Sequence, residues 1–221
     1  MAQAGSIKAV VFDLDGTLLD TLPDIGAGSN AALRHFGLEE RAMSDYRKAV
    51  GNGIRVLIRR AMQQQVSDEV YEQVLSFYLK YYPEQCCVHT KFYPGVEQML
   101  DNLKNTGLML GILSNKTEKT AQKIIDHFLP DFPFAFLWGN NGERPLKPDT
   151  TAGIQLCKKL GLNADQIMYV GDGDTDMEFG VKMGFYTVGV TWGYRDRDVL
   201  QAFGPTALVD APDELLNLLR Q

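Results

Sequence analysis

The sequence has no surplus of positive charge. Its 221 residues contain 22 Lys and Arg against 28 Asp and Glu, which gives a formal net charge of −6. Nucleic acids and anionic membrane surfaces repel such a chain on average, so we expect neither as a partner. The composition, 45% hydrophobic and 23% charged, is that of an ordinary globular protein with one sizeable core or two small ones.

Cysteine is also scarce. Cys86, Cys87 and Cys157 lack the spacing of a metal site, and two of them are adjacent, which does not suit a disulfide framework. We therefore expect reduced thiols. The opening segment MAQAGSIKAVVFDLDG has neither the positive start nor the long apolar run of a signal peptide, because Asp13 and Asp15 interrupt its hydrophobic stretch. These absences predict a cytoplasmic protein.

Short apolar runs that end in polar or glycine-containing turns predict buried strands. The runs are 7–12, 108–113, 167–170 and 185–190, with a less regular one at 134–137. Helical patterns of suitable length lie between them, and three of these are followed at or just after their end by glycine. They cover 96–105, 117–129, 150–160 and 176–183. The alternation predicts an α/β fold, a three-layer, Rossmann-like parallel sheet with helices on both faces.

One long segment departs from this alternation. Three helical patterns follow one another in it without a convincing strand: 22–36, 53–65 and 68–82. The segment begins directly after the turn of the first strand and ends before Tyr93-Pro94-Gly95, where the alternation resumes. We therefore expect an inserted α-helical cap domain over 18–90 and a catalytic core made of 1–17 and 91–221.

Polar residues gather where these strands end. In open parallel sheets, ligands bind beyond the carboxyl ends of the strands. The residues there, together with a lysine from the loop RPLKPD, are Asp13, Asp15, Gly16, Thr17, Ser114, Asn115, Asp172, Asp174, Asp176 and Lys147. Carboxylates about 5 Å apart repel by roughly 3 kcal/mol per ionised pair at an effective dielectric constant of about 20. A divalent cation offsets that repulsion, and Mg²⁺ fits oxygen ligands while leaving positions for water and a substrate phosphate.

The remaining groups suit an anion. The hydroxyls of Ser114 and Thr17, the backbone amides at the Gly16 turn and the ammonium of Lys147 can all face phosphate oxygens. One Asp can attack phosphorus and form an aspartyl-phosphate, while a neighbouring carboxyl protonates the leaving group. The set predicts phosphoryl transfer.

Four segments in this order, FDLDGTLLDT, ILSNK, the lysine of KPD, and VGDGDTD, resemble the four motifs of the haloacid dehalogenase-like hydrolases. The resemblance covers the whole chain, and the helical insertion after the first motif is similar to that of the phosphoglycolate phosphatase-like branch. It implies that Asp13 is the nucleophile and Asp15 the general acid and base. It also implies that Lys147 stabilises the charge of the phosphoryl group and of Asp13.

The same resemblance implies a magnesium site formed by Asp13, Asp172, Asp176 and the backbone carbonyl of Asp15. Gly173 stands where relatives often carry Ser, a small departure that affects one hydroxyl near the metal. Asp174 matches no role in the family's pattern.

Four residues are candidates for substrate binding: Thr17, Ser114, Asn115 and Arg55. Ser114 matches the family position that binds the transferring phosphoryl group. The glycine-containing segment 51–53 is similar to a cap loop that faces the active site in related phosphatases, so Arg55 is a candidate for an anionic substrate tail. The alternative is a solvated arginine in the first turn of a helix.

These observations predict a Mg²⁺-dependent phosphatase that hydrolyses a small phosphomonoester through an aspartyl-phosphate, with phosphoglycolate as the first candidate. Within the family, a phosphomutase of the beta-phosphoglucomutase type, a pyrophosphatase and a nucleotidase are alternatives. A non-catalytic phosphoacceptor is the alternative from another class, although such a relative would be expected to have lost one of Asp13, Asp15, Lys147 and Asp172. No oligomeric state is predicted.

Overall fold

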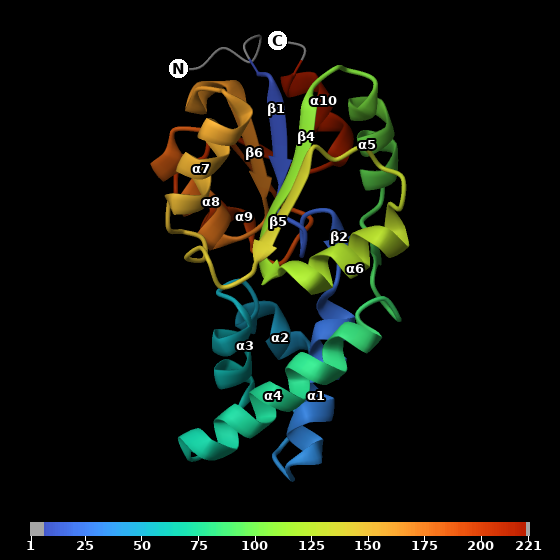
Figure 1. Cartoon of the computed structure of the whole chain (residues 1–221), viewed down its shortest axis with the longest axis vertical. Helices are drawn as coiled ribbons and strands as arrows, with labels where there is room; N and C mark the ends of the chain where they lie inside the picture. Colours follow the sequence, from blue (N-terminus) through green and yellow to red (C-terminus); the bar gives the residue numbers. More distant parts are fainter. Residues whose placement is uncertain (1–6, 220–221) are drawn as a thin grey trace.

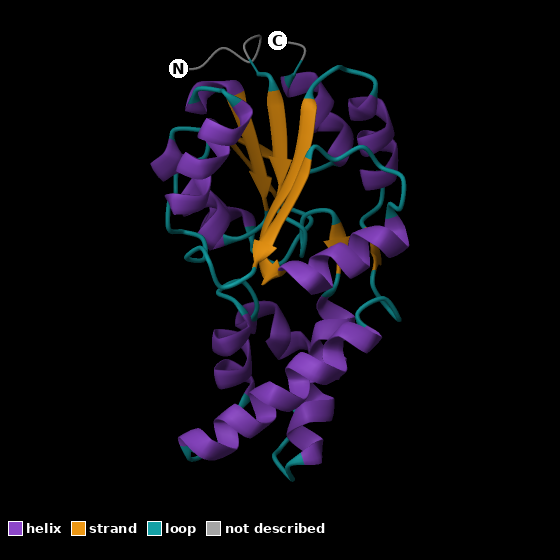
Figure 2. Cartoon of the chain, viewed as in Figure 1, coloured by secondary structure: helices purple, strands orange, loops and turns teal. Residues whose placement is uncertain are grey.

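The computed structural model describes residues 7–219 and contains a six-stranded parallel sheet (Figure 2). The strand order is β5-β4-β1-β6-β7-β8. The strands are β1 Ala9–Phe12, β4 Met109–Thr117, β5 Phe136–Asn140, β6 Ile167–Gly171, β7 Tyr186–Val190 and β8 Ala207–Val209. The predicted parallel sheet is confirmed. The three-residue β8 was not predicted, and β5 begins two residues later than expected.

Strand β1 lies in the middle of the sheet, between β4 and β6. All four of its residues are fully buried, as the apolar run AVVF predicts for a parallel strand covered on both faces. Because β4, β1 and β6 are parallel, their carboxyl ends meet at one edge. The residues that follow β1 and β6, and those near the end of β4, are therefore neighbours in space.

Helices cover both faces of the sheet (Figure 1). They are α5 Val96–Lys104, α6 Glu118–Phe128, α7 Thr151–Leu160, α8 Asp174–Met183, α9 Arg197–Gln201 and α10 Pro212–Leu218. Alternate residues of a strand face opposite sides of a sheet. Val10 and Phe12 accordingly belong to a buried cluster with residues of α5, α6 and α10, whereas Ala9 and Val11 belong to a second cluster with residues of α7 and α8. The predicted three layers are confirmed.

A helical insert follows β2 (Leu19–Asp20) and ends before β3 (Lys91–Phe92), and these two short strands pair antiparallel. Its helices are α1 Leu22–His35, α2 Met43–Ala49, α3 Ile54–Ala61 and α4 Asp68–Gln85. They form a separate group beyond the carboxyl ends of the sheet strands (Figure 1). The insert that the sequence predicts is therefore present. Its domain boundaries, 18 and 90, lie beside β2 and β3 and stay a prediction.

Two features of the insert differ from the expectation. Helix α3, expected over 53–65, ends at Ala61. Met62 adopts an extended backbone, and the polar run 63–65 has no apolar positions to bury. The seven-residue helix α2 was not predicted, since its length leaves little periodicity to detect. In the core, helix α8 begins at Asp174, two residues before the expected start.

Within residues 7–219, no helix combines the length and the apolar character that a bilayer crossing requires. The prediction that no signal peptide opens the chain concerns residues 1–6 in part, and these lie outside the described residues.

Candidate active site

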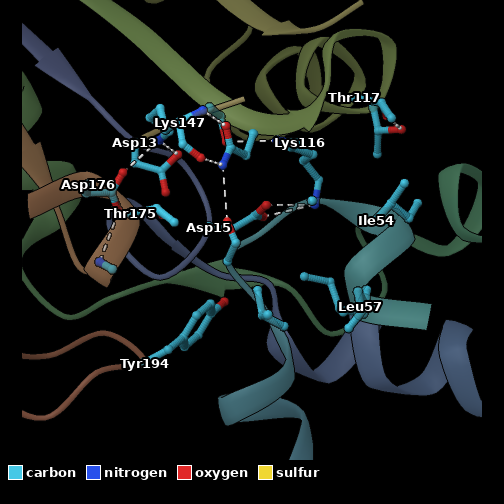
Figure 3. A pocket seen from close by; sticks show the side chains of 18 of the residues that line it. Asp13, Asp15, Ile54, Leu57, Lys116, Thr117, Lys147, Thr175, Asp176 and Tyr194 are labelled. Atoms are coloured by element: carbon cyan, nitrogen blue, oxygen red, sulfur yellow. Dashed lines mark hydrogen bonds and ion pairs between the residues drawn. The ribbon is translucent and has the colours of Figure 1, made fainter. Parts of the chain in front are cut away.

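A pocket of about 90 Å³ lies between the carboxyl ends of the sheet strands and the helical insert (Figure 3). We call its two sides the core wall and the cap wall. The core wall includes Asp13, Asp15, Ser114, Asn115, Lys116, Lys147, Asp172, Asp176, Tyr194 and Arg195. The cap wall comprises Ile25, Val50, Gly51, Gly53, Ile54, Leu57, Tyr78, Leu79, Tyr82 and Pro83.

Asp13 directly follows β1, and its backbone N–H donates to the carbonyl of Val170 at 2.9 Å. That bond extends the pairing of β1 with β6 by one residue and fixes where the carboxyl group emerges. The residue is buried, and burial raises the pKa of its carboxyl to about 6 although the nearby Lys147 ammonium opposes the rise. Asp13 is a buried carboxylate at the floor of the pocket.

Lys147 lies beside Asp13 and is almost completely buried. Its ammonium donates to the carbonyl of Leu113 at 3.0 Å, the hydroxyl of Tyr169 at 2.8 Å and Oδ1 of Asp176 at 2.7 Å. Burial lowers the pKa of Lys147, but the charges of Asp13 and Asp176 outweigh it and the net direction is upward, so the lysine stays protonated.

Oδ1 of Asp13 is a buried oxygen that accepts no hydrogen bond from the described residues. It lies 3.0 Å from Nζ of Lys147, but the three N–H groups of that ammonium already serve three other acceptors. Within residues 7–219 this buried oxygen has no hydrogen-bond partner. Buried polar atoms in folded proteins nearly always have one, so the atom is available for a cation or a reaction.

Three carboxylates converge at this point. One oxygen from each of Asp13, Asp172 and Asp176 lies within 4.8 Å of the others, and all three residues are buried. Burial, followed by the charges of Asp176 and Asp13, raises the pKa of Asp172 well above its usual value. An oxygen-rich, electrostatically strained cluster of this kind fits a hard divalent cation, and the unpartnered Asp13 oxygen lies within it.

Backbone and side-chain contacts hold the other two carboxylates in place. Asp172 accepts from the backbone N–H of Tyr194 at 2.7 Å and from the hydroxyl of Thr17 at 3.0 Å. Asp176 accepts from the backbone N–H of Gly173 at 2.9 Å, a bond that closes the first turn of α8. Gly16 has φ +84°, and a Cβ there would collide with the Asp172 carboxylate, so the turn after β1 requires glycine.

Asp15 lies apart from this cluster and faces the insert (Figure 3). Its Oδ1 accepts from the hydroxyl of Thr21 at 2.6 Å, and Nζ of Lys116 contacts its two oxygens at 2.9 and 3.1 Å. The side chain is 14% exposed. Asp13 and Asp15 are thus two carboxylates of one motif in different surroundings.

Three of the four residues predicted to bind substrate lie in or beside the pocket, each in different surroundings. Ser114 is buried and lines the pocket, as the prediction requires. Asn115 also lines it, but its amide binds the carbonyls of Gly51 at 3.2 Å and Lys147 at 3.0 Å and thereby connects the two walls. Thr17 is buried against Asp172 and is not a lining residue.

The structure does not bring Arg55 to the pocket. Its guanidinium is 65% exposed and binds Glu72 at 2.7 Å. Its neighbours Ile54 and Leu57, on another side of the same helix, line the pocket instead.

Sequence reasoning missed Lys116 and Tyr169. Lys116 lies within ILSNK, but strand alternation does not single it out, because residues 114–117 all line the pocket and the pairing of β4 with β5 is irregular between Leu113 and Thr117. Tyr169 lies in a fully buried strand, where a large aromatic residue reads as core, and its hydrogen bonds to Lys147 and Asp176 leave no mark in the sequence.

Comparisons with known proteins agree with this geometry. A family model described as haloacid dehalogenase-like hydrolase matches residues 10–190. The phosphoglycolate phosphatases of Aquifex aeolicus and Haemophilus influenzae are each 31% identical to this chain over 96% of its length, and the alignments cover 97% and 98% of those proteins. The crystal structure of a predicted phosphoglycolate phosphatase from Haemophilus somnus has a TM-score of 0.91 at 30% identity, over 96% of this chain and 98% of that one.

Fold and site together define a parallel-sheet hydrolase with a helical insert after its first motif. The chain belongs to the haloacid dehalogenase-like hydrolase family. The resemblance seen in the four motifs is confirmed, and so is the prediction that the chain is an enzyme. The two curated relatives named above are phosphatases.

Proposed function

We propose that this hydrolase is a Mg²⁺-dependent phosphatase that acts on a small phosphomonoester, with phosphoglycolate as its substrate. The observation that carries the proposal is the unpartnered oxygen of Asp13, buried beside the protonated Lys147 and within the three-carboxylate cluster. The names of relatives that are 31% identical over nearly the full length support the choice of substrate.

The residues present fit a magnesium ion. Asp13, Asp172 and Asp176 would hold it with their side chains, and the backbone carbonyl of Asp15 is a further ligand that the family resemblance suggests. The ion would supply positive charge that draws the phosphate in and offsets the mutual repulsion of the carboxylates. Two lysines, Lys116 and Lys147, face the four carboxylates of the core wall, which leaves negative charge for the ion to balance.

The reaction divides into two displacements at phosphorus. In the first, an oxygen of Asp13 attacks the phosphoryl group, the bond from phosphorus to the ester oxygen breaks, and Asp15 gives that oxygen a proton. In the second, Asp15 takes a proton from water, whose oxygen attacks the aspartyl-phosphate. Inorganic phosphate leaves and the Asp13 carboxylate is restored. Ser114 holds the transferring group, and the positive charge of Lys147 stabilises the negative charge on it.

The separation of the two carboxylates suits these two roles. The nucleophile has to be ionised, and Lys147 beside Asp13 favours the charged form. The acid and base has to reach the leaving group, and Asp15 faces the insert, from which side the substrate tail would project.

The test is phosphate release from a panel of esters: phosphoglycolate, sugar phosphates, nucleotides and pyrophosphate, each with Mg²⁺ and with a chelator. Selective, Mg²⁺-dependent release from phosphoglycolate is the expected result. Release from nucleotides or pyrophosphate alone would overturn the substrate assignment. Isomerisation of a sugar phosphate without release would indicate a mutase, and stable phosphorylation without turnover would indicate a phosphoacceptor.

A further inference from the structure

Lys116 is a buried cation of the pocket to which the proposed reaction gives no part. It lies near the end of β4, and its side chain is 6% exposed. Its ammonium contacts both oxygens of Asp15 and donates to the hydroxyl of Tyr82 at 2.8 Å. Tyr82 belongs to α4 of the insert, so the lysine lies where the core wall meets the cap wall.

The other cations that line the pocket within residues 7–219 are Lys147 and Arg195, and both are already held by other groups: all three N–H groups of Lys147 and three of the five of Arg195 are engaged. Lys147 donates to three acceptors below Asp13. Arg195 binds Asp174 and the carbonyls of Arg47 and Val50. Lys116 differs, because two of its contacts go to the two oxygens of the same carboxylate, that of Asp15. One N–H group is enough to hold Asp15, so a second N–H group of Lys116 can donate to another anion.

The surroundings of Lys116 on the insert are poor in positive charge. The described cap wall consists of apolar side chains, glycines and two tyrosines, and it holds no lysine or arginine. An anionic substrate tail buried against such a wall needs a charged partner, because an unpaired carboxylate in apolar surroundings is strongly disfavoured. Lys116 is placed to be that partner.

The chemistry of the proposed reaction fixes where the tail would lie. Asp15 protonates the ester oxygen and must therefore be in contact with it. In phosphoglycolate the carboxylate carbon is two bonds from that ester oxygen. Nζ of Lys116 is 2.9 Å from the nearer oxygen of Asp15, so a cation already adjoins the place from which the tail extends.

We propose that Lys116 binds the carboxylate of the substrate and selects phosphomonoesters that carry a carboxylate two bonds from the ester oxygen. This assignment rests on the proposed phosphatase function and narrows its substrate class. Tyr82, whose hydroxyl already contacts the ammonium, lies on the other side of the same ion site and keeps Lys116 directed into the pocket.

The experiment compares phosphoglycolate with phosphoglycolamide, its isosteric amide, in the wild type and in Lys116→Met. The wild type is expected to prefer the carboxylate. In the variant the ratio of kcat/KM for the two esters should fall about 10- to 100-fold, the range for a lost hydrogen bond between charged groups, with the loss mainly in KM for phosphoglycolate.

Lys123→Met is the matched control. It removes the same charge and also breaks a contact between core and insert, the pair with Glu84 at 3.0 Å, but Lys123 is not a pocket residue. Its ratio should equal that of the wild type. If Lys116→Met does not fold, Lys116→Gln retains an N–H donor for Asp15 or Tyr82 without the charge and should show the same fall.

Two results overturn the assignment in different ways. An equal loss for both esters would show that Lys116 only positions Asp15. A wild type that hydrolyses phosphoglycolamide as well as phosphoglycolate would show that the carboxylate is not recognised, while leaving the phosphatase in place. A wild type that releases phosphate from neither ester contradicts the proposed function itself.

Discussion

The two walls of the pocket are built differently. In the core wall, hydrogen bonds and ion pairs hold the buried carboxylates and lysines in place. Lys147, for example, donates to Leu113, Tyr169 and Asp176. The cap wall offers mainly apolar surface, such as Ile25 and Leu57. Groups that must hold a reacting atom in place benefit from a rigid sheet edge, whereas groups that exclude water need shape alone.

The charged groups and the apolar lining of the pocket therefore have separate origins in this chain. Asp13, Lys116 and Asp172 come from the ends of three adjacent strands, whose positions the sheet determines, whereas Lys147 comes from the loop between β5 and α7. The cap wall comes from helices that contact the core through a few polar bridges. One bridge is the amide of Asn115 on the carbonyl of Gly51, and another is Lys116 on Tyr82.

The largest effect is expected from the core wall. Asp13→Asn keeps the shape of the side chain but removes the nucleophile, so turnover of phosphoglycolate should fall by at least about 10³-fold. Phosphate release measures the loss, and circular dichroism of the purified variant checks the fold. A folded variant with near-normal turnover would remove Asp13 from the nucleophile role.

The next effect concerns the metal. Asp172→Ala removes one of the three converging carboxylates. The Mg²⁺ concentration for half-maximal activity should rise by about 100-fold or more, since even partners of metal ligands typically contribute 10- to 100-fold. A Mg²⁺ titration of phosphate release tests this, and an unchanged midpoint contradicts the assignment. Asp174→Ala is the matched control, because that carboxylate binds Arg195 and lies outside the cluster.

The contrast between the walls also explains what the sequence could reveal. Strand ends are visible as apolar runs that stop at polar residues, and parallel strands place those ends together, so Asp13, Ser114 and Asp172 could be grouped in advance. The short elements α2, α9 and β8 have too few residues to show a period.

The insert was harder to interpret because its helices show which face is apolar but not what that face contacts. Arg55 illustrates the point. Ile54, Leu57 and Ile58 form an apolar stripe at helical spacing, and Arg55 lies off that stripe on the exposed side. The periodicity excludes Arg55 from the buried face, but only the tertiary structure shows that the stripe includes pocket residues.

A moderate effect is expected where the walls are joined. Arg47 of α2 donates to the carbonyls of Tyr194 at 2.6 Å and Gly193 at 3.1 Å, while Arg195 donates back to the carbonyls of Arg47 and Val50. The backbone N–H of Tyr194 also holds Asp172. This reciprocal pair therefore connects the position of the insert to a carboxylate of the metal cluster.

Arg47→Met should lower kcat/KM for phosphoglycolate by about 10-fold, because two partly buried hydrogen bonds to carbonyls are lost and each contributes about 0.5–1 kcal/mol. Steady-state kinetics at saturating Mg²⁺ measures the change. Arg34→Met is the control, since Arg34 is an exposed residue of the insert whose ion-pair partner, Glu40, also belongs to the insert. Equal kcat/KM values in the two variants would show that the contacts of Arg47 with the core do not position the insert for catalysis.

The smallest effect is on stability without metal. Burial raises the pKa of Asp13 from 3.8 to about 6, and it raises that of Asp172 in the same direction. Between about pH 4 and pH 6 the folded state therefore binds more protons than the unfolded state, so stability is greatest at the acidic end and is lost as pH rises through the folded-state pKa. The expected fall in Tm in chelator is a few degrees, at about 2–4 °C per kcal/mol for a chain of this size.

Asp13→Asn removes this contribution together with the repulsion that the Asp13 charge exerts on Asp172. The variant carries no ionisable group at residue 13, so its Tm in chelator should fall less with pH, and the difference between the variant and the wild type should grow from pH 4.5 to pH 7 in favour of the variant. Mg²⁺ should reduce that difference, because an ion bound by the carboxylates stabilises their charged forms only in the folded wild type. Parallel Tm curves would mean that the core wall holds the Asp13 charge without cost, and the contrast drawn with the uncharged cap wall would lose its energetic basis.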